Sequence, residues 1–249
     1  MAGSEKVVEI CQLTHLDEFQ EVINLQKIIW GFADIELLPL RFLVVASKVG
    51  GHIFGAYDGN EMVGFCFAIP GMKSEGMNIP YLHSHMLGVL PAYHNAGIGR
   101  RLKLQQREEA MGRGIGLIEW TFDPLELKNA FFNIERLGAI ITRYSENQYG
   151  VTASPLHGGL PTDRCIAEWW LWSPRVEKIL KGEKGEQKVD ERISYPFDIA
   201  RIRRDERERA REIQLTNGEK FRKAFEQGLA VTGFERSGTE GTYLLEKWQ

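Results

Sequence analysis

The fold of this chain is decided by the stretch Leu87-Gly88-Val89-Leu90-Pro91-Ala92-Tyr93-His94-Asn95-Ala96-Gly97-Ile98-Gly99-Arg100-Arg101-Leu102. It begins as an apolar strand, passes through a turn with two glycines, and continues as a helix expected to reach about Met111. Glycines let a backbone approach a ligand closely, and the first N–H groups of a helix have no partner within the helix. Because these N–H groups carry partial positive charge, the turn suits an anion such as a phosphate. The candidate binding residues are Asn95, Ala96, Gly97, Ile98, Gly99 and Arg100.

Two other phosphate-binding loops are excluded by their spacing. A Rossmann turn needs a third glycine where Leu102 stands, and a Walker loop needs Gly-Lys followed by Ser or Thr, which this turn lacks. A turn that starts a helix and binds nothing remains the alternative.

The segments around this turn predict an α/β fold with a mixed sheet. Short β-branched or apolar runs predict strands at 7–13, 52–57, 62–69, 81–89, 115–122, 140–144 and 166–172. Apolar residues at helical spacing predict three more helices, one between Thr14 as N-cap and Gly31, one at 40–48 and one at 125–137. The order is a meander followed by crossover helices.

Two motifs resemble signatures of the GNAT superfamily of N-acetyltransferases. The first is a strand ending in Val-x-Pro and then Arg or Gln-x-x-Gly-x-Gly or Ala; Val89, Pro91, Gly97 and Gly99 match, and His94 stands where Arg or Gln is usual. The second is a helix ending in a Leu-Gly-Phe-like turn, here 129–139 with Leu137-Gly138-Ala139. The resemblance covers roughly residues 7–172. It implies a mostly antiparallel central sheet with flanking helices and a splayed strand pair.

The resemblance implies where an acyl-coenzyme A would bind. The strand carrying Leu87 and Val89 is expected to splay from the strand that begins near Ile118, with pantetheine hydrogen-bonded to the Leu87–Val89 backbone. The pyrophosphate is expected on the N–H groups of Asn95 to Arg100. Acetyl-CoA is the default donor, and a longer or dicarboxylic acyl-CoA such as succinyl-CoA stays open. No metal is expected.

His83 and His85 are the candidate catalytic residues. Two residues apart on one strand, they face the same way. Aminolysis of a thioester needs a neutral amine, and an alkyl amine has a pKa of about 10.4, so a histidine base with a pKa near 6.5 suits the task. The pair also resembles the histidine relay of arylalkylamine N-acetyltransferases in its offsets before His94. Structural histidines, or metal ligands lacking an identifiable third ligand, are the alternatives.

The sequence indicates the general acid and the acceptor site less clearly than the cofactor site. Many family members place a tyrosine where this chain has Ile134, and Tyr144, Asn133 or water are the substitutes considered. Arg164 near a cleft edge is a candidate to bind an acceptor carboxylate, with a surface ion pair as the equal alternative. The tryptophans at 169, 170 and 172 are expected in the core or at an interface.

The composition limits the possible functions of the chain and its location in the cell. The chain has 249 residues, 31 basic and 34 acidic, with a net charge of −3, which argues against a dedicated nucleic-acid binder. No apolar run approaches the roughly 20 residues that span a bilayer, and the N-terminus lacks a signal-peptide layout. Cys11, Cys66 and Cys165 suggest no disulfide framework. We therefore expect a cytoplasmic protein with no membrane partner.

The predicted organisation is a catalytic domain with an appended segment. Residues 1–174 form the GNAT-like domain, 175–197 a charged linker, and 198–249 a C-terminal α+β extension with a helix and a closing hairpin. Its apolar residues predict that the extension packs on the core or across a homodimer axis. The function expected is acyl-CoA-dependent N-acyl transfer to a small-molecule amine or amino acid. A CoA-binding regulatory or interaction module with a degenerate catalytic centre is the alternative.

Overall fold

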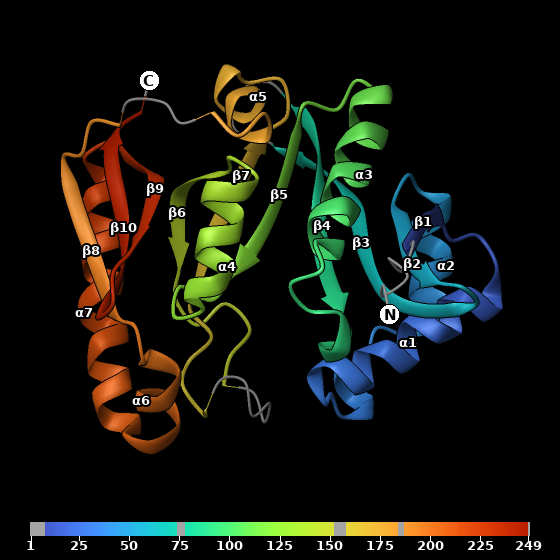
Figure 1. The fold of residues 1–249 in the computed structure, drawn as a ribbon, viewed down its shortest axis with the longest axis horizontal. Coiled ribbons are helices and arrows are strands. Elements are labelled where there is room, and N and C mark those ends of the chain that lie inside the picture. Colours follow the sequence, from blue (N-terminus) through green and yellow to red (C-terminus); the bar gives the residue numbers. More distant parts are fainter. Residues whose placement is uncertain (1–7, 74–77, 152–157, 184–186, 249) are drawn as a thin grey trace, which may run out of the picture. The chain divides into compact units, whose positions relative to one another are not determined.

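The computed structural model describes residues 8–73, 78–151, 158–183 and 187–248 (Figure 1). Val7, the first residue of the first predicted strand, lies outside these ranges. The chain forms two compact units, Met1–Ile118 and Glu119–Gln249, and each is described by itself.

The first unit is a four-stranded antiparallel sheet in the order β1-β2-β3-β4, covered by helices. Its elements are β1 (Val8–Gln12), α1 (Leu16–Trp30), η1 (Asp34–Glu36), α2 (Leu40–Lys48), β2 (His52–Asp58), β3 (Glu61–Lys73), β4 (Ile79–Val89), η2 (Pro91–Tyr93) and α3 (Ile98–Gly112).

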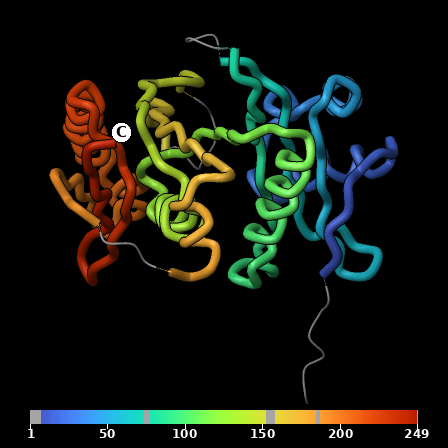
Figure 2. The backbone as a smooth tube through the Cα atoms, turned by 90° about the horizontal axis from the view of Figure 1, so that it is seen from above, coloured from blue at the N-terminus to red at the C-terminus, as the bar shows by residue number. Residues whose placement is uncertain are grey.

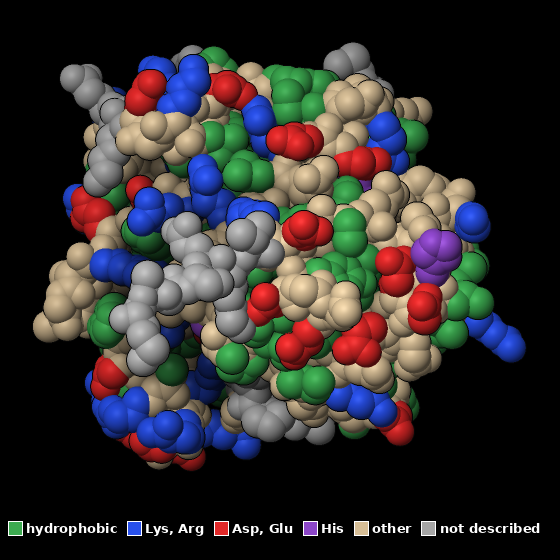
Figure 3. Space-filling model, turned by 45° about the vertical axis from the view of Figure 1, so that its right-hand side comes forward, with side chains coloured by type: hydrophobic (Ala, Val, Ile, Leu, Met, Phe, Trp, Pro, Cys, Tyr) green, Lys and Arg blue, Asp and Glu red, His purple; other side chains and the backbone are tan. Residues whose placement is uncertain are grey.

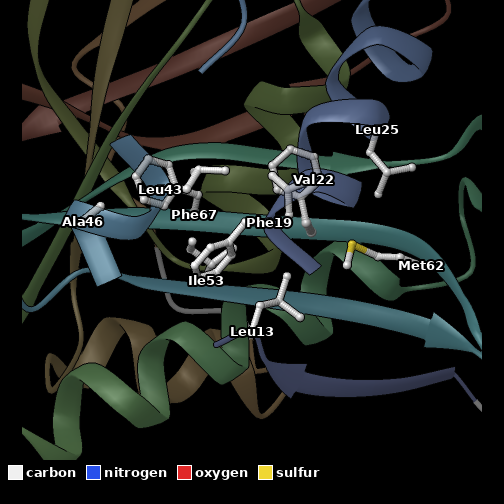
Figure 4. Close-up of a cluster of buried hydrophobic side chains, with 10 residues drawn as sticks. Leu13, Phe19, Val22, Leu25, Leu43, Ala46, Ile53, Met62 and Phe67 are labelled. Atoms are coloured by element: carbon white, nitrogen blue, oxygen red, sulfur yellow. The ribbon is translucent and has the colours of Figure 1, made fainter. Parts of the chain in front are cut away.

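The two faces of this sheet are covered by different helices. On one face α1 and α2 bury Phe19, Val22 and Leu43 against Phe65 and Phe67 of β3, a cluster shown in Figure 4. On the other face, α3 packs its buried Ile98 and Leu102 against the strands. Figure 2 shows this helix lying along the sheet. Because side chains alternate along a strand, neighbouring residues of β3 and β4 point to different helices.

The second unit contains the remaining elements, and most of its strands pair in antiparallel fashion in the order β5-β7-β6-β9-β10-β8. They are β5 (Leu117–Phe122), which begins in the last residues of the first unit, α4 (Leu127–Phe131), η3 (Phe132–Arg136), β6 (Ile140–Ser145), β7 (Arg164–Trp170), α5 (Pro174–Leu180), β8 (Glu191–Pro196), α6 (Ile199–Asp205), α7 (Arg207–Glu226), β9 (Leu229–Arg236) and β10 (Glu240–Lys247).

The C-terminal segment continues the sheet of this unit. Strand β9 pairs antiparallel with β6, with Val231 opposite Ile141, and the β9–β10 hairpin then carries β8 on its outer side. The prediction that this segment packs on the core is confirmed within the unit. The predicted hairpin is confirmed as β9–β10. The helix expected at about 205–228 corresponds to α7, and the short helix α6 before it was not predicted.

Aromatic rings fill the core between α7 and these strands. Phe221 of α7 is fully buried; it stacks on Tyr144 of β6 at 5.6 Å between ring centroids and meets the edge of Tyr243 of β10 at 5.2 Å. Burying a large aromatic side chain supplies several times the stabilisation of an aliphatic contact at the surface. The extension is therefore a structural part of this unit.

The predicted linker at 175–197 is corrected by the structure. Helix α5 and strand β8 lie inside that range, and residues 184–186 are outside the described part of the chain. Sequence reasoning missed them because charged residues dominate the range, while only Val176, Ile193 and Tyr195 bring it into the core. The compact division at Ile118 also differs from the predicted boundary at 174, which stays a prediction.

Two helix ends also differ from expectation. Helix α1 is capped by His15 and not by Thr14, because the Glu18 carboxylate accepts both the Thr14 and the His15 backbone N–H. The helix predicted at 125–137 widens into a π-helical turn, η3, after Phe131. Gly138, at φ 81°, ends it as expected.

The predicted fold class is confirmed: mixed α/β, with mostly antiparallel strands and flanking helices. The splay expected between the strands at 81–89 and 115–122 stays a prediction. No helix in the described ranges combines the length and the apolar composition that crossing a membrane requires.

Gly218 of α7 provides a test of this packing. A Cβ there would lie 2.9 Å from Tyr144 Oη, whose hydroxyl donates to Asp163 at 2.7 Å and cannot easily move. We expect Gly218→Ala to lower the free energy of unfolding by about 1–3 kcal/mol, as overpacking does, although alanine is the better helix former. Urea unfolding measures it.

Gly112→Ala is the matched control for this substitution. Gly112 is also helical, but a Cβ there meets nothing within 4 Å, so stability should stay the same or rise slightly. Equal behaviour of the two variants would contradict the proposed role of Gly218.

Candidate functional site

The turn between β4 and α3 has the backbone that its glycine spacing predicts. Asn95 has φ 65° and Gly97 has φ 77°, both in the left-handed region, and α3 begins at Ile98 with Gly97 as its N-cap. A side chain at position 97 would be strained by that φ, which explains why glycine stands there. The turn itself, from Pro91 to Gly97, is exposed except for Tyr93.

The start of α3 presents N–H groups without a helical acceptor. The first hydrogen bond of the helix runs from Arg101 N to Gly97 O at 3.1 Å, so the N–H groups of Ile98 and Gly99 precede any i−4 carbonyl that they could reach within the helix. A Cβ at Gly97 meets nothing within 4 Å, and one at Gly99 meets only Leu87 Cδ2 at 3.8 Å. Within the first unit, the space beside these two glycines is therefore open.

Two side chains hold the turn on the sheet. His94 donates from Nε2 to the Val89 carbonyl at 3.0 Å, and Tyr93 donates its hydroxyl to Asp58 at 2.6 Å. His94 thus braces the end of β4, a use that accounts for histidine at a motif position where Arg or Gln is usual. Arg100 is half-buried and Arg101 is exposed at the same helix start.

The residues expected to bind pantetheine lie near the end of β4. Leu87 and Val89 are half-buried, opposite Cys66 and Gly64 of β3. Sequence and structure therefore agree on their strand, and their contact with a ligand stays a prediction.

His83 and His85 lie on one side of β4, as predicted. Their ring centroids are 5.9 Å apart, and His85 meets Phe67 edge-on at 6.2 Å, which places the pair on the face covered by α1 and α2. The pairing of β3 with β4 shifts at this point, from Ala68↔Ser84 to Phe67↔Met86, so His85 is the extra residue of a β-bulge. A bulge re-aims side chains, and here it lies within the candidate catalytic pair.

Burial changes the acid–base character expected of this pair. Desolvation, then the neighbouring His85 and Lys103, lower the pKa of His83 from 6.5 to about 4. Desolvation also lowers the pKa of His85, although its outer edge is exposed. Both rings are therefore neutral at pH 7, and the pKa near 6.5 expected of a histidine base is corrected downward for His83.

The opposite face of β4 carries a polar group that sequence reasoning missed. Ser84 Oγ accepts from Lys103 Nζ at 2.7 Å and donates to Gln106 Oε1 at 2.9 Å, and all three side chains are buried. Burial lowers the pKa of Lys103 to about 7, against a smaller upward effect of Cys66. The only sequence signal was a lysine and a glutamine three residues apart on the apolar side of α3.

None of the considered general acids has an exposed polar group at the expected place. Ile134 is fully buried in η3, and the Asn133 side chain is also buried. The Tyr144 hydroxyl is bonded to Asp163, and burial raises its pKa. Tyr144 thus serves the packing of the second unit, which leaves water as the candidate.

Arg164, the candidate for an acceptor carboxylate, is buried at the start of β7. Its guanidinium lies 4.0 Å from Asp123, donates to the Asp163 carbonyl at 3.1 Å, and covers the Tyr149 ring at 5.4 Å. The same Asp123 also binds Arg203 of α6 at 3.0 Å. Arg164 therefore belongs to a buried ion-pair network rather than to an open cleft edge.

The tryptophans behave as expected for core residues, with one exception. Trp169 is fully buried and donates to the Leu137 carbonyl at 2.6 Å, whereas Trp172 is 53% exposed. In the described ranges no group of three or more His, Cys, Asp or Glu is arranged to hold a metal ion.

Comparison with known proteins identifies one family model. Residues 49–138 match the acetyltransferase (GNAT) domain, a range that holds the histidine pair, the glycine turn and the helix ending at Gly138. A search of curated proteins found no match.

Solved structures with the same fold come from bacteria and plants. A GNAT-family structure from Desulfovibrio desulfuricans superposes with a TM-score of 0.53 at 17% identity and covers 66% of this chain and 99% of its own. NAA60 from Arabidopsis thaliana, in complex with a bisubstrate analogue, gives 0.53 at 14% identity over 65% of this chain and 98% of its own. The same plant protein with acetyl-CoA gives 0.53 at 11% identity over 66% and 99%. At these identities the likeness shows the fold.

Proposed function

The resemblance to the GNAT superfamily is confirmed by the match over residues 49–138, and from that premise we propose that this chain passes an acyl group from acyl-CoA to a small amine. The single observation that carries the proposal is the turn at Asn95–Gly99, with its left-handed Gly97 and its open N–H groups at the start of α3. Acetyl-CoA is the default donor, since NAA60, with the same fold, was solved with acetyl-CoA.

The turn supplies the chemistry that a pyrophosphate needs. The N–H groups of Ile98 and Gly99 point out of the helix start, where the helix dipole favours a negative charge. Arg100 and Arg101 add positive charge beside them. This cradle binds a phosphate without a metal or a basic surface, in keeping with the net charge of −3.

In the proposed reaction, His83 removes the proton from the acceptor nitrogen, directly or through His85 or water. The nitrogen lone pair then attacks the thioester carbonyl, the carbon–sulfur bond breaks, and the thiolate leaves with the bonding electrons. A neutral imidazole is needed for the first step. His83 is neutral at pH 7, and its pKa of about 4 makes it a weaker base than an ordinary histidine.

The leaving group does not require a tyrosine acid. A thiol with a pKa of about 8.5 departs as thiolate at pH 7 at a cost of roughly 2 kcal/mol, so water suffices to protonate it. The buried Ile134 in place of the usual tyrosine is therefore compatible with turnover.

The acceptor is proposed to be a small-molecule amine or an amino acid. The structure does not favour Arg164 as the partner of an acceptor carboxylate, because its side chain already lies in the ion-pair network with Asp123. The face shown in Figure 3 carries both acidic and basic side chains, and the net charge of −3 does not favour a nucleic-acid partner. The three cysteines are unpaired, which supports a cytoplasmic location; a homodimer is left open.

Acyl-CoA should raise the thermal stability of the wild type, because only the folded chain presents the turn. At a hundred times its dissociation constant, the ligand would add about 2.7 kcal/mol. Gly97→Ala should weaken binding at least tenfold, about 1.4 kcal/mol, since a Cβ would occupy the open side of the turn. Differential scanning fluorimetry with acetyl-CoA and succinyl-CoA measures both.

Gly59→Ala separates backbone strain from lost binding. Gly59 also has a positive φ, 61°, with nothing within 4 Å, but lies in the β2–β3 turn, so it should lose stability and keep the full ligand shift. No shift of the wild type with any acyl-CoA would refute the donor assignment. Binding without thiol release across an amine panel would favour the regulatory module.

The pH dependence of turnover tests His83. With a pKa of about 4, kcat at saturating substrates should change little between about pH 6 and pH 8, where a histidine at 6.5 would give a rise of about fourfold. His83→Gln should lower kcat by about 10²–10⁴-fold and keep the affinity for acyl-CoA. His94→Gln, which retains a donor toward Val89, is the control. Full activity of His83→Gln would return this residue to a structural role.

A further inference from the structure

On the α3 face of β4, the strand that carries the histidine pair, a buried lysine, Lys103, donates a hydrogen bond to the strand. Ser84 lies between His83 and His85 in sequence, and strand alternation turns its side chain to the α3 face. There Ser84 Oγ accepts the hydrogen bond from Lys103 Nζ at 2.7 Å. One ammonium group thus contacts β4 directly behind the proposed base.

This contact is retained at a cost in stability. Lys103 is 2% exposed, and burying an ammonium is expensive. The neighbouring Gln106 Nε2 is buried and has no hydrogen-bond partner among the described residues. Apolar residues of similar volume would fill the same space at a smaller cost in folding free energy. Polar groups kept at such a cost are typical of functional sites.

The other charged groups on this face are few and lie on identified elements. Cys66 of β3 is the titratable neighbour of Lys103, and burial raises the pKa of its thiol to about 12, so it is uncharged near pH 7. Farther along α3, Glu109 accepts from His52 of β2 at 2.7 Å and from Arg113 at 2.8 Å. On the opposite face, α1 and α2 turn apolar side chains toward the sheet, and His85 is the titratable neighbour of His83.

We propose that Lys103 is a positioning residue of the acyl-transfer site: it holds Ser84, and with it the bulged strand, and its charge adds to the effect of burial on His83. The proposal rests on the proposed function for its catalytic meaning. The lysine touches neither substrate nor donor, and it acts through β4.

The bulge explains why the strand needs this anchor. The extra residue, His85, follows Ser84 directly, and a bulged strand has one residue without a regular partner on the neighbouring strand. The Lys103–Ser84–Gln106 bonds fix the last regular position before the bulge. Because His83 and His85 flank that position, fixing Ser84 fixes the direction of both rings.

The charge of Lys103 adds to the effect of burial on His83. Protonating His83 would place a second positive charge near Lys103, which is itself protonated in the range around pH 4 where His83 titrates. The lysine thereby adds to the effect of burial and of His85 in lowering the pKa of His83. Removing the lysine charge should raise that pKa, while burial keeps it below 6.5.

The test is an NMR titration of the histidine rings in the whole protein, with no acyl-CoA or amine present. In Lys103→Met the titration midpoint of His83 should rise by roughly half a pH unit, about a threefold gain in proton affinity. The same change at an exposed helical lysine, Lys48→Met, should leave the midpoint where it is in the wild type. His83→Gln assigns the signal.

Two further variants separate the charge from the hydrogen bond. Lys103→Gln keeps a donor for Ser84 without the charge, so the midpoint of His83 should rise as in Lys103→Met; it also serves should the methionine variant not fold. Ser84→Ala keeps the charge and loses the anchor, so the midpoint should stay low while kcat falls about tenfold or more with the acyl-CoA dissociation constant unchanged.

Each result decides a part of the proposal. A midpoint that stays at the wild-type value in both lysine variants overturns the role of the charge, and full turnover in Ser84→Ala overturns the role of the anchor. If no acyl-CoA and amine react with the wild type, the proposed function fails, and the titration still decides whether Lys103 controls His83.

Discussion

The hydrogen bond from Arg101 N to Gly97 O fixes the start of α3, and much of the first unit depends on that start. It leaves the amides of Ile98 and Gly99 at the open end of the helix, available to an anion. It also sets the rotation of the helix, so Leu102, Lys103 and Gln106 all point at the sheet. A helix that began one residue later would turn each of them by about 100°. One backbone constraint therefore orients both the anion cradle and the lysine behind β4.

Strand β4 joins two environments with opposite demands. Toward α1 and α2 it presents titratable rings beside Phe67, and burial there disfavours the charged form of the rings. Toward α3 it presents a hydroxyl that satisfies a buried ammonium. The thin backbone of one strand separates the two, so electrostatic effects pass between them over a short path of low dielectric. In the proposed reaction, this strand would have a chemical function beyond its role in the sheet.

Local patterns predicted much of the fold and of the candidate site, whereas long-range packing did not emerge from the sequence. The glycine turn and the common side of His83 and His85 follow from spacing alone, because backbone geometry within a few residues decides them. The role of Lys103 could not be predicted from the sequence, because its partner Ser84 comes within reach only when α3 packs on the sheet. The lowered pKa of His83 depends on burial by α1 and α2. Strand β8 was missed because Ile193 and Tyr195 are too few to outweigh the charges around them.

The pairing of β9 with β6 sets an order of events during synthesis on the ribosome. Ile141 of β6 can pair only after Val231, about 90 residues later in the chain, has been synthesised. By contrast, each of the strands β1 to β4 pairs with the next strand along the chain. At a translation rate of about 5–20 residues per second, β6 has an unpaired edge for several seconds after it leaves the ribosome. During that interval the nascent chain carries an open strand edge, the kind of surface that other chains add to. Strand β9, which is made after β6, covers this edge, so chains released before β9 lack the element that closes it.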